Sequence, residues 1–222
     1  MIALSGDTRG IEALYQLSRN ETVLSMCKND FLIILGNCGI TEAHTDFHEN
    51  VLMYRDLPCS VLYLDGAHDD YDLLADHPLF PWNGGMTQNI SRYLTHLVRG
   101  QVFSLGGKKF FVMGGSTTPG RDDRGKYYDW WPEQDIFPAE MDEAYANLKE
   151  NGNRVDYVLT CECPTSWKTC VKGVKTPCSE SLEELLAHVD YSHWFFSSER
   201  LTEIPEHRAT GIGQEVLVLG KE

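Results

Sequence analysis

The sequence predicts an α/β fold, and three observations lead to this class. In the N-terminal half, short apolar runs of strand length alternate with segments whose apolar residues have helical spacing. Several of these runs end directly in short polar or glycine-containing turns, as the buried strands of open sheets do. The composition, with 42% hydrophobic and 23% charged residues, is typical of a globular chain. We find no internal repeat or flexible linker, so residues 1–222 are expected to form a single domain.

Three strands and a helix are predicted near the N-terminus. The runs 2–5, 31–35 and 61–64 are almost wholly apolar, which is typical of strands buried on both faces. The segment 11–18 carries apolar residues at 11, 14 and 17, the spacing of an amphipathic helix.

The remaining elements are predicted from turns and capping residues. A helix is expected from Pro138 to about Glu150, because proline is favoured in the first turn of a helix. An irregular loop is expected from Gly114 to about Asp135. Further strands are expected over 90–97, 101–105, 109–113, 155–160, 193–196 and 215–219, and a further helix over 181–188.

The charge balance makes two classes of partner improbable. Acidic residues outnumber basic ones 33 to 19, which gives a formal net charge of -14. Such a surface repels phosphate backbones and anionic lipid, so neither duplex nucleic acid nor a membrane is an expected partner. Residues 1–7 have neither the basic nor the apolar character of a signal peptide, and a cytoplasmic location is expected, with the 7 cysteines mostly reduced.

Five predicted strands end in turns that carry polar residues. The turns read Gly6-Asp7-Thr8-Arg9-Gly10, Gly36-Asn37-Cys38-Gly39, Gly66-Ala67-His68-Asp69, Thr160-Cys161-Glu162-Cys163-Pro164 and Ser197-Ser198-Glu199-Arg200. Since ligands of α/β sheets bind beyond the carboxyl ends of strands, we expect these turns to form one site.

In order and placement, these turns resemble the five strand-end motifs of the calcineurin-like metallophosphoesterases. Flanking segments such as Trp82-Asn83-Gly84-Gly85 and His193-Trp194-Phe195-Phe196 resemble a small bacterial branch of that family. The resemblance spans nearly the whole chain. It implies a calcineurin-like sandwich of two mixed β-sheets flanked by helices, with a phosphoesterase site at the strand ends.

The resemblance also shows that most metal ligands of the family are replaced. The family's ligand positions fall on Asp7, Arg9, Asn37, Ala67, Cys161, Ser198 and Arg200. Of these, Asp7 alone keeps the family's ligand type, and the catalytic histidine of the family corresponds to His68. An arginine has a permanent charge and no lone pair for a metal. We therefore expect no dinuclear metal centre; the alternative is a single divalent ion such as Mn²⁺ or Zn²⁺.

The replacements suggest how the site is compensated. The guanidinium groups of Arg9 and Arg200 are expected to pair with Asp7 in place of a metal; alternatively, both point to solvent. Cys161 is either a ligand of a rebuilt zinc site or, more simply, a buried thiol. His68 is either a general acid or a structural residue of its turn.

The loop 114–129 is a further candidate for ligand contact. Its residues Arg121 and Arg124 are suited to a phosphate, and Tyr127 and Tyr128 to stacking on a base. Alternatively, it is a mobile surface loop whose acidic and basic residues balance.

The sequence thus predicts a pseudo-phosphoesterase that binds a phosphate-bearing small molecule such as a nucleotide. The expected ligand-binding residues are Asp7, Arg9, Asn37, His68, Cys161, Arg200, Arg121 and Arg124. One alternative is a protein-interaction module on a vestigial scaffold, which would bind a protein partner. Another is a residual metal-dependent phosphodiesterase or phosphatase that uses His68 as its catalytic residue.

Overall fold

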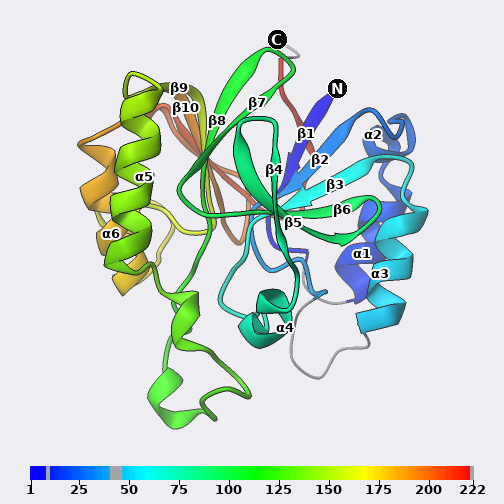
Figure 1. The fold of residues 1–222 in the computed structure, drawn as a ribbon, viewed down its shortest axis with the longest axis horizontal. Helices are drawn as coiled ribbons and strands as arrows, with labels where there is room; N and C mark the ends of the chain where they lie inside the picture. The colour runs from blue at the N-terminus through cyan, green and yellow to red at the C-terminus, as the bar shows by residue number, and fades with distance from the viewer. Residues whose placement is uncertain (9–10, 41–46, 221–222) are drawn as a thin grey trace.

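A computed structural model describes residues 1–8, 11–40 and 47–220 of the chain. Within these ranges two β-sheets face each other, and helices lie on their outer sides (Figure 1). The helices are α1 (Ile11–Arg19), α2 (Glu21–Leu24), α3 (Phe47–Asp56), α4 (Tyr71–Ala75), α5 (Pro138–Glu150) and α6 (Pro177–Leu186), with short 3₁₀ turns at Arg121–Asp123, Pro132–Gln134, Thr165–Trp167 and Pro205–His207. None of the helices in these ranges is long and apolar enough to cross a membrane.

The first sheet, as far as the chain is described, has the order β13-β1-β2-β3-β6-β5-β4. Its strands are β13 (Leu217–Val218), β1 (Ile2–Ser5), β2 (Phe31–Ile34), β3 (Ser60–Tyr63), β6 (Leu94–Leu97), β5 (Gly85–Ser91) and β4 (Leu79–Trp82). Strands β1, β2, β3 and β6 are parallel, and the outer pairs are antiparallel. The parallel strands therefore end at one edge of the sheet.

The second sheet has the order β11-β12-β10-β9-β8-β7 over the described residues. Its strands are β11 (Thr202–Ile204), β12 (Ala209–Ile212), β10 (Asp190–Ser197), β9 (Arg154–Thr160), β8 (Lys108–Met113) and β7 (Gln101–Leu105). Strands β8, β9, β10 and β12 are parallel, whereas β7 and β11 join as antiparallel edges. Both sheets are thus mixed, as the resemblance implied.

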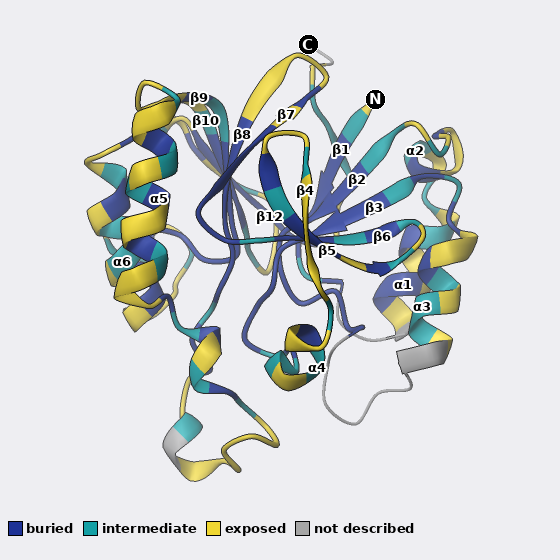
Figure 2. Cartoon of the chain, viewed as in Figure 1, coloured by how far each residue is buried: buried dark blue, intermediate teal, exposed yellow. Residues whose placement is uncertain are grey.

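Apolar side chains fill the space between the sheets. Leu4, Ile33 and Leu62 of the first sheet belong to one buried cluster with Phe110 and Val112 of the second. This accounts for the nearly continuous apolar runs of β1, β2 and β3, since their other faces are covered by helices. Figure 2 shows the buried strands between helices whose outer faces are exposed.

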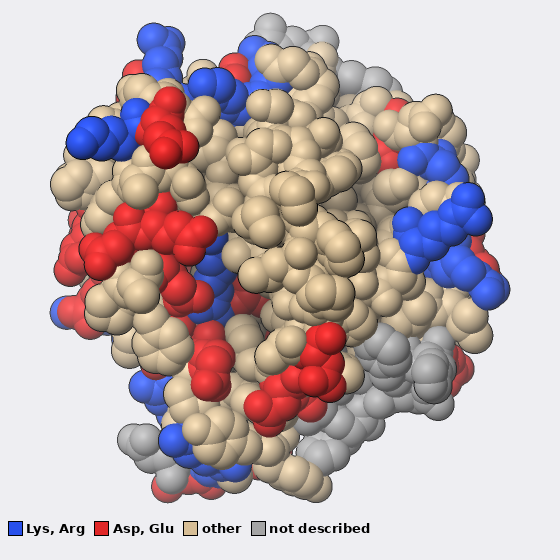
Figure 3. Space-filling view, viewed as in Figure 1, with Lys and Arg blue, Asp and Glu red and all other residues tan. Residues whose placement is uncertain are grey.

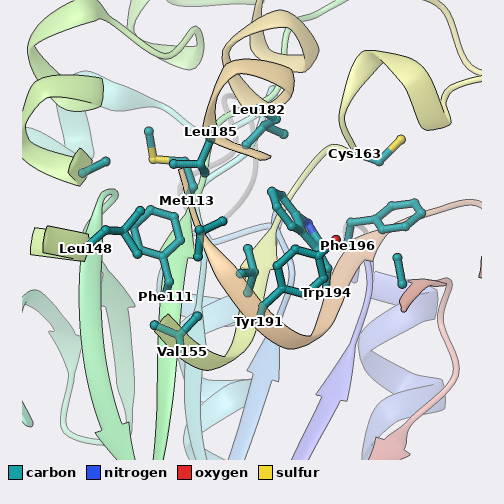
Figure 4. Packing of buried hydrophobic residues seen from close by; sticks show 14 of the residues in the cluster. Phe111, Met113, Leu148, Val155, Cys163, Leu182, Leu185, Tyr191, Trp194 and Phe196 are labelled. Carbon is teal, nitrogen blue, oxygen red and sulfur yellow. The ribbon is translucent and has the colours of Figure 1, made fainter. Parts of the chain in front are cut away.

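Each sheet has a helical layer on its outer face. Beneath α1 and α3, a second cluster includes Leu17 and Tyr54. Beneath α5 and α6, Leu182 packs with the aromatic residues of β10 (Figure 4). There Trp194 meets Trp167 edge to face, with ring centroids 5.3 Å apart. These clusters fix the strands whose ends carry the candidate site.

The expected elements are found, with two differences of interest. The single strand expected over 90–97 is a hairpin, because the chain turns at Arg92 and Tyr93 between β5 and β6. The helix expected over 181–188 begins at Pro177, where Thr176 caps it by accepting a hydrogen bond from the N–H of Ser179. Helices α2, α3 and α4 and strands β4, β11 and β12 were not predicted.

Candidate functional site

The ends of β1, β2 and β10 meet through hydrogen bonds. Asp7 follows β1, Asn37 follows β2, and Ser197 ends β10. The Nδ2 of Asn37 donates to Oδ2 of Asp7 at 3.0 Å. The backbone N–H of Asp7 donates to Oγ of Ser197 at 3.1 Å, which joins the two sheets. The structure therefore brings these turns to one place.

The side chain of Asn37 also holds the turn after β3. Its Oδ1 accepts the backbone N–H of His68 at 3.1 Å, so both ends of the amide are engaged. Gly66 lies so close that a Cβ there would be 2.4 Å from this oxygen. Asn37 itself has a φ of 46°, a left-handed conformation that asparagine tolerates better than most residues. The amide thus connects three strand ends.

Cys161 follows β9 and lies against the turn after β2. A Cβ on Gly36 would be 2.2 Å from its Sγ, so the two residues are in close contact. Burial raises the pKa of the Cys161 thiol well above its usual range, and the negative charges of Glu162 and Asp7 act in the same direction. The residue is therefore a protonated thiol, a weak ligand and a weak nucleophile.

These strand ends border a cavity of about 470 Å³, a volume within the range of small-molecule sites. Its described lining comprises Asp7, Asn37, Ser116, Thr117, Pro119, Cys161, Glu162, Cys163, Lys168, Val171, Lys172, Gly173, Val174, Thr176, Ser197, Ser198 and Glu199. Of the residues expected to bind a ligand, Asp7, Asn37 and Cys161 are in this set.

The buried carboxylate of Glu162 holds two segments of the cavity wall together. Its Oε1 accepts the Oγ of Ser116 at 3.0 Å and the N–H of Thr117 at 2.8 Å. Its Oε2 accepts the Oγ1 of Thr176 at 2.6 Å and forms an ion pair with Lys168. Glu162 thus ties the loop after β8 to the segment that leads into α6. Sequence reasoning did not select it, although a charged residue directly after an apolar strand is a signal for such a role.

A smaller hollow of about 190 Å³ adjoins the cavity and contains two basic residues. Lys172 and Arg200 both line it, together with Val171, Ser198, Glu199 and Thr202. Val171, Lys172, Ser198 and Glu199 also line the cavity, so the two spaces are neighbours. Arg200 is exposed, and among the described residues no ion pair joins it to Asp7.

The loop after β8 contributes differently from what its sequence suggested. Arg121 forms an ion pair with Asp135 and lies over the ring of Trp130, at 5.1 Å from its centroid. Arg124 is exposed, and like Arg121 it is not among the described residues that line the cavity. The cavity instead receives Ser116, Thr117 and Pro119 from the first part of the loop.

Two further expected site residues are placed as follows. His68 is half-buried, and its backbone rather than its imidazole makes the hydrogen bond to Asn37. Its side chain is not part of the described cavity lining. Arg9 lies outside the described residues.

The donor atoms at the strand ends do not fit a dinuclear metal centre. The amide of Asn37 is engaged at both ends by hydrogen bonds. Ala67 has no donor in its side chain. In the described ranges no group of three His, Cys, Asp or Glu residues is arranged to hold a metal ion. We therefore derive no chemistry from a metal here.

A second recess, which the sequence did not suggest, surrounds Asp65 at the end of β3. Arg99 pairs with Asp65, and His96 Nε2 lies 3.0 Å from Oδ1 of the same carboxylate. The other ring nitrogen of His96 faces Oε1 of Gln88 at 2.8 Å. Glu140 also pairs with Arg99 at 3.2 Å. Figure 3 shows acidic atoms around this hollow and basic atoms inside it.

The side chains of this recess hold one another in place. The Nε2 of Gln88 donates to two backbone carbonyls, so its Oε1 is the atom that faces His96. Asp65 in turn contacts both His96 and Arg99, and this network has a structural role.

Comparisons with known proteins assign no family to the chain. No family model matches the sequence, and no curated protein matches it. Among solved structures, the chain is similar to a protein of unknown function from Aquifex aeolicus. The two share 15% identity with a TM-score of 0.37, over 83% of this chain and 92% of the other.

Proposed function

We propose that this chain binds a phosphate-bearing small molecule, such as a nucleotide, on a calcineurin-like metallophosphoesterase scaffold without the dinuclear metal centre. Two mixed sheets flanked by helices support the scaffold, and the five motif-like turns follow β1, β2, β3, β9 and β10. The site is the cavity at these strand ends together with the hollow that adjoins it.

The observation that carries this proposal is the placement of Lys172 and Arg200 in one hollow. In the described structure neither side chain forms an ion pair with a carboxylate, whereas Lys168, which lines the adjoining cavity, is paired with Glu162. Two cations in one hollow attract a dianion, and an arginine can donate two parallel hydrogen bonds to a phosphate.

Hydroxyl groups beside the hollow supply further donors. Ser198 lines both the hollow and the cavity. Ser197 accepts the N–H of Asp7, so its own hydrogen can be donated to a ligand. One residue opposes the proposal: Glu199 lines the same hollow, and its charge reduces the attraction for an anion.

The test is titration with inorganic phosphate and pyrophosphate, followed by calorimetry and by thermal unfolding at constant ionic strength. At ten times Kd, a bound ligand should stabilise the fold by about 1.4 kcal/mol. For a chain of this length that corresponds to a rise in Tm of about 3–6 °C. Lys172→Ala and Arg200→Ala should each abolish most of the rise, and Glu199→Gln should tighten binding.

Lys149→Ala is the matched control, because this exposed lysine lies at the end of α5, away from the cavity lining. It should leave phosphate binding unchanged. No stabilisation of the wild type by either anion, or equal losses in Lys149→Ala and Lys172→Ala, would contradict the proposal.

A further inference from the structure

The recess around Asp65 has an apolar side and an acidic side. Its volume is about 300 Å³, at the lower limit of small-molecule sites. Leu74 of α4 and Leu79 of β4 line it, and so do Glu140 and Glu143 of α5. In Figure 1, α5 lies to the left of α4 and β4, so the apolar and the acidic groups line different sides of the recess.

Part of the apolar lining is in contact with water. Leu79 is 56% exposed, and Phe137, the residue before α5, is 42% exposed. Both belong to the lining of the recess. A bound ligand would remove this surface from water, which favours binding. The exposed ring of Phe137 would also attract a cation placed over its face.

The charged groups at the floor of the recess are occupied by one another. Asp65 pairs with Arg99 and also accepts a hydrogen bond from the hydroxyl of Tyr71 at 2.8 Å. Each nitrogen of the Arg99 guanidinium has an acceptor, and Nη1 lies 3.2 Å from Oε2 of Glu140. This buried arginine is therefore not available to an anionic ligand.

The acidic side has an excess of negative charge. Glu133 and Glu143 are exposed, and no ion pair among the described residues engages either carboxylate. Nε2 of Gln101 donates to Oε1 of Glu143 at 2.6 Å and holds this side chain in place. Even if His96 is charged, carboxylates outnumber cations in the described lining. Figure 3 shows acidic atoms beside the hollow on the side of α5, and this excess favours a cationic ligand.

A cationic head on an apolar stem matches both sides of the recess. Arginine and lysine side chains have this form. The guanidinium group of arginine is more weakly hydrated than an ammonium group, donates to carboxylates through two nitrogens and stacks on aromatic rings. In a polypeptide, apolar residues next to the arginine would cover the exposed parts of Leu79 and Phe137. The lining therefore favours an arginine with apolar neighbours over a small free cation.

We propose that this recess docks an arginine side chain of a protein partner, with its guanidinium group at Glu133 and Glu143 and its apolar neighbours on Leu79 and Phe137. The described linings of this recess and of the strand-end cavity with its adjoining hollow share no residue. The inference is thus independent of the proposed phosphate site.

The experiment titrates the ¹⁵N-labelled protein with four probes and follows the backbone amides by NMR. The probes are acetyl-Leu-Arg-Leu-amide, the same peptide with lysine or with citrulline in place of arginine, and butylguanidinium. Citrulline keeps the shape of arginine without its charge. The arginine peptide should shift the amides of Ala75, Val98 and Phe137, which line the recess. It should bind about tenfold more tightly than the citrulline peptide or butylguanidinium, and about threefold more tightly than the lysine peptide.

Two variants separate the acidic side from the apolar side. Glu143→Gln removes a charge and keeps an oxygen that can accept the hydrogen bond of Gln101. It should weaken the arginine peptide about three- to tenfold and leave the citrulline peptide unchanged. Leu79→Ser should weaken both peptides by a similar factor. Glu150→Gln is the matched control, because this exposed glutamate ends α5 outside the recess lining, and it should change neither affinity. An unchanged Tm of the unliganded variants shows that they are folded.

Several results would overturn this inference. The absence of shifts at the recess amides, equal affinities of the arginine and citrulline peptides, or equal losses in Glu143→Gln and Glu150→Gln would each show that no cation docks here. If butylguanidinium binds as tightly as the arginine peptide, the recess takes a small cation and the protein partner is wrong. If the lysine peptide binds as tightly, the assignment of arginine is wrong. Each of these results leaves the proposed phosphate site as it stands, since that site is tested with other ligands.

Discussion

Asn37 donates a hydrogen bond of 3.0 Å from Nδ2 to Oδ2 of Asp7. The neutral amide makes this contact attractive without a metal. A carboxylate in its place would leave two negative oxygens next to each other.

Asn37→Asp should therefore destabilise the protein at neutral pH. Two carboxylates at this distance repel, and the pKa of one of them rises. We expect a loss of about 1–3 kcal/mol at pH 7.5 and a smaller loss at pH 5, where the shared proton relieves the repulsion. Urea unfolding of the wild type and the variant at pH 7.5 and at pH 5 measures this loss of stability.

Asn89→Asp serves as the control for this change. The Oδ1 of Asn89 accepts a hydrogen bond from Oγ1 of Thr95 at 3.2 Å, a role that a carboxylate also fills. Its stability should be nearly that of the wild type. Addition of Mn²⁺ should not restore Asn37→Asp, because Ala67 still provides no donor; a large rise in Tm with Mn²⁺ would show that the strand ends can hold a metal.

Asp65→Asn should be the more damaging change, because it breaks a buried ion pair with Arg99. Burial alone would raise the pKa of Asp65, but the charge of Arg99 and the contacts with His96 outweigh it and hold this pKa well below the usual range. Removal of one partner of a buried pair costs about 3–5 kcal/mol.

The pH dependence of this loss follows from the depressed pKa. The stabilisation by Asp65 is present above its unfolded pKa of about 3.9 and is lost as the pH falls towards the folded value. The difference between wild type and Asp65→Asn should thus be constant from pH 5 to 7 and shrink in acid. Asp156→Asn, which breaks an exposed pair with Lys108, should cost much less, and equal losses in the two variants would contradict this account.

The strands were predictable because their signal is local. The apolar runs that became β1, β2 and β3 are uninterrupted, and the turn residues Asp7 and Asn37 follow them directly. Parallel strands must then bring such turns to one edge, so part of the site follows from the order of elements.

The partners of the buried charges were not predictable in the same way. Thr117 and Glu162 are 45 residues apart in the chain, and Asp65 and Arg99 are 34 apart. In both pairs, the sequence around one residue does not indicate which distant residue it will contact. Arg121 shows the same limit for a residue that was expected to contact a ligand. It was expected to bind a phosphate, but the fold pairs it with Asp135.

Gly36→Ala should destabilise the protein for two separable reasons. Gly36 has a φ of 103°, and an added Cβ would lie 2.2 Å from Sγ of Cys161. We expect a loss of about 2–4 kcal/mol in urea unfolding. Gly152→Ala, with a φ of 70° and nothing within 4 Å, measures the backbone strain alone and should lose less. Cys161→Ala should recover part of the loss when combined with Gly36→Ala; full additivity of the two changes would show that the contact is not the cause.

His193 should make the stability depend on pH below about 7. Its pKa is lowered, chiefly because burial disfavours the charged ring, while the charge of Glu203 acts in the opposite direction. Since the unfolded chain takes up this proton first, near pH 6.5, stability from this residue falls as the pH drops and levels off below the folded pKa. His193→Gln, whose amide can still donate to Oγ1 of Thr210, should flatten the profile of Tm against pH. His188→Gln changes an exposed histidine and serves as the control; it should leave the slope of Tm against pH as in the wild type. An unchanged slope in His193→Gln would show that His193 is not the source of the pH dependence.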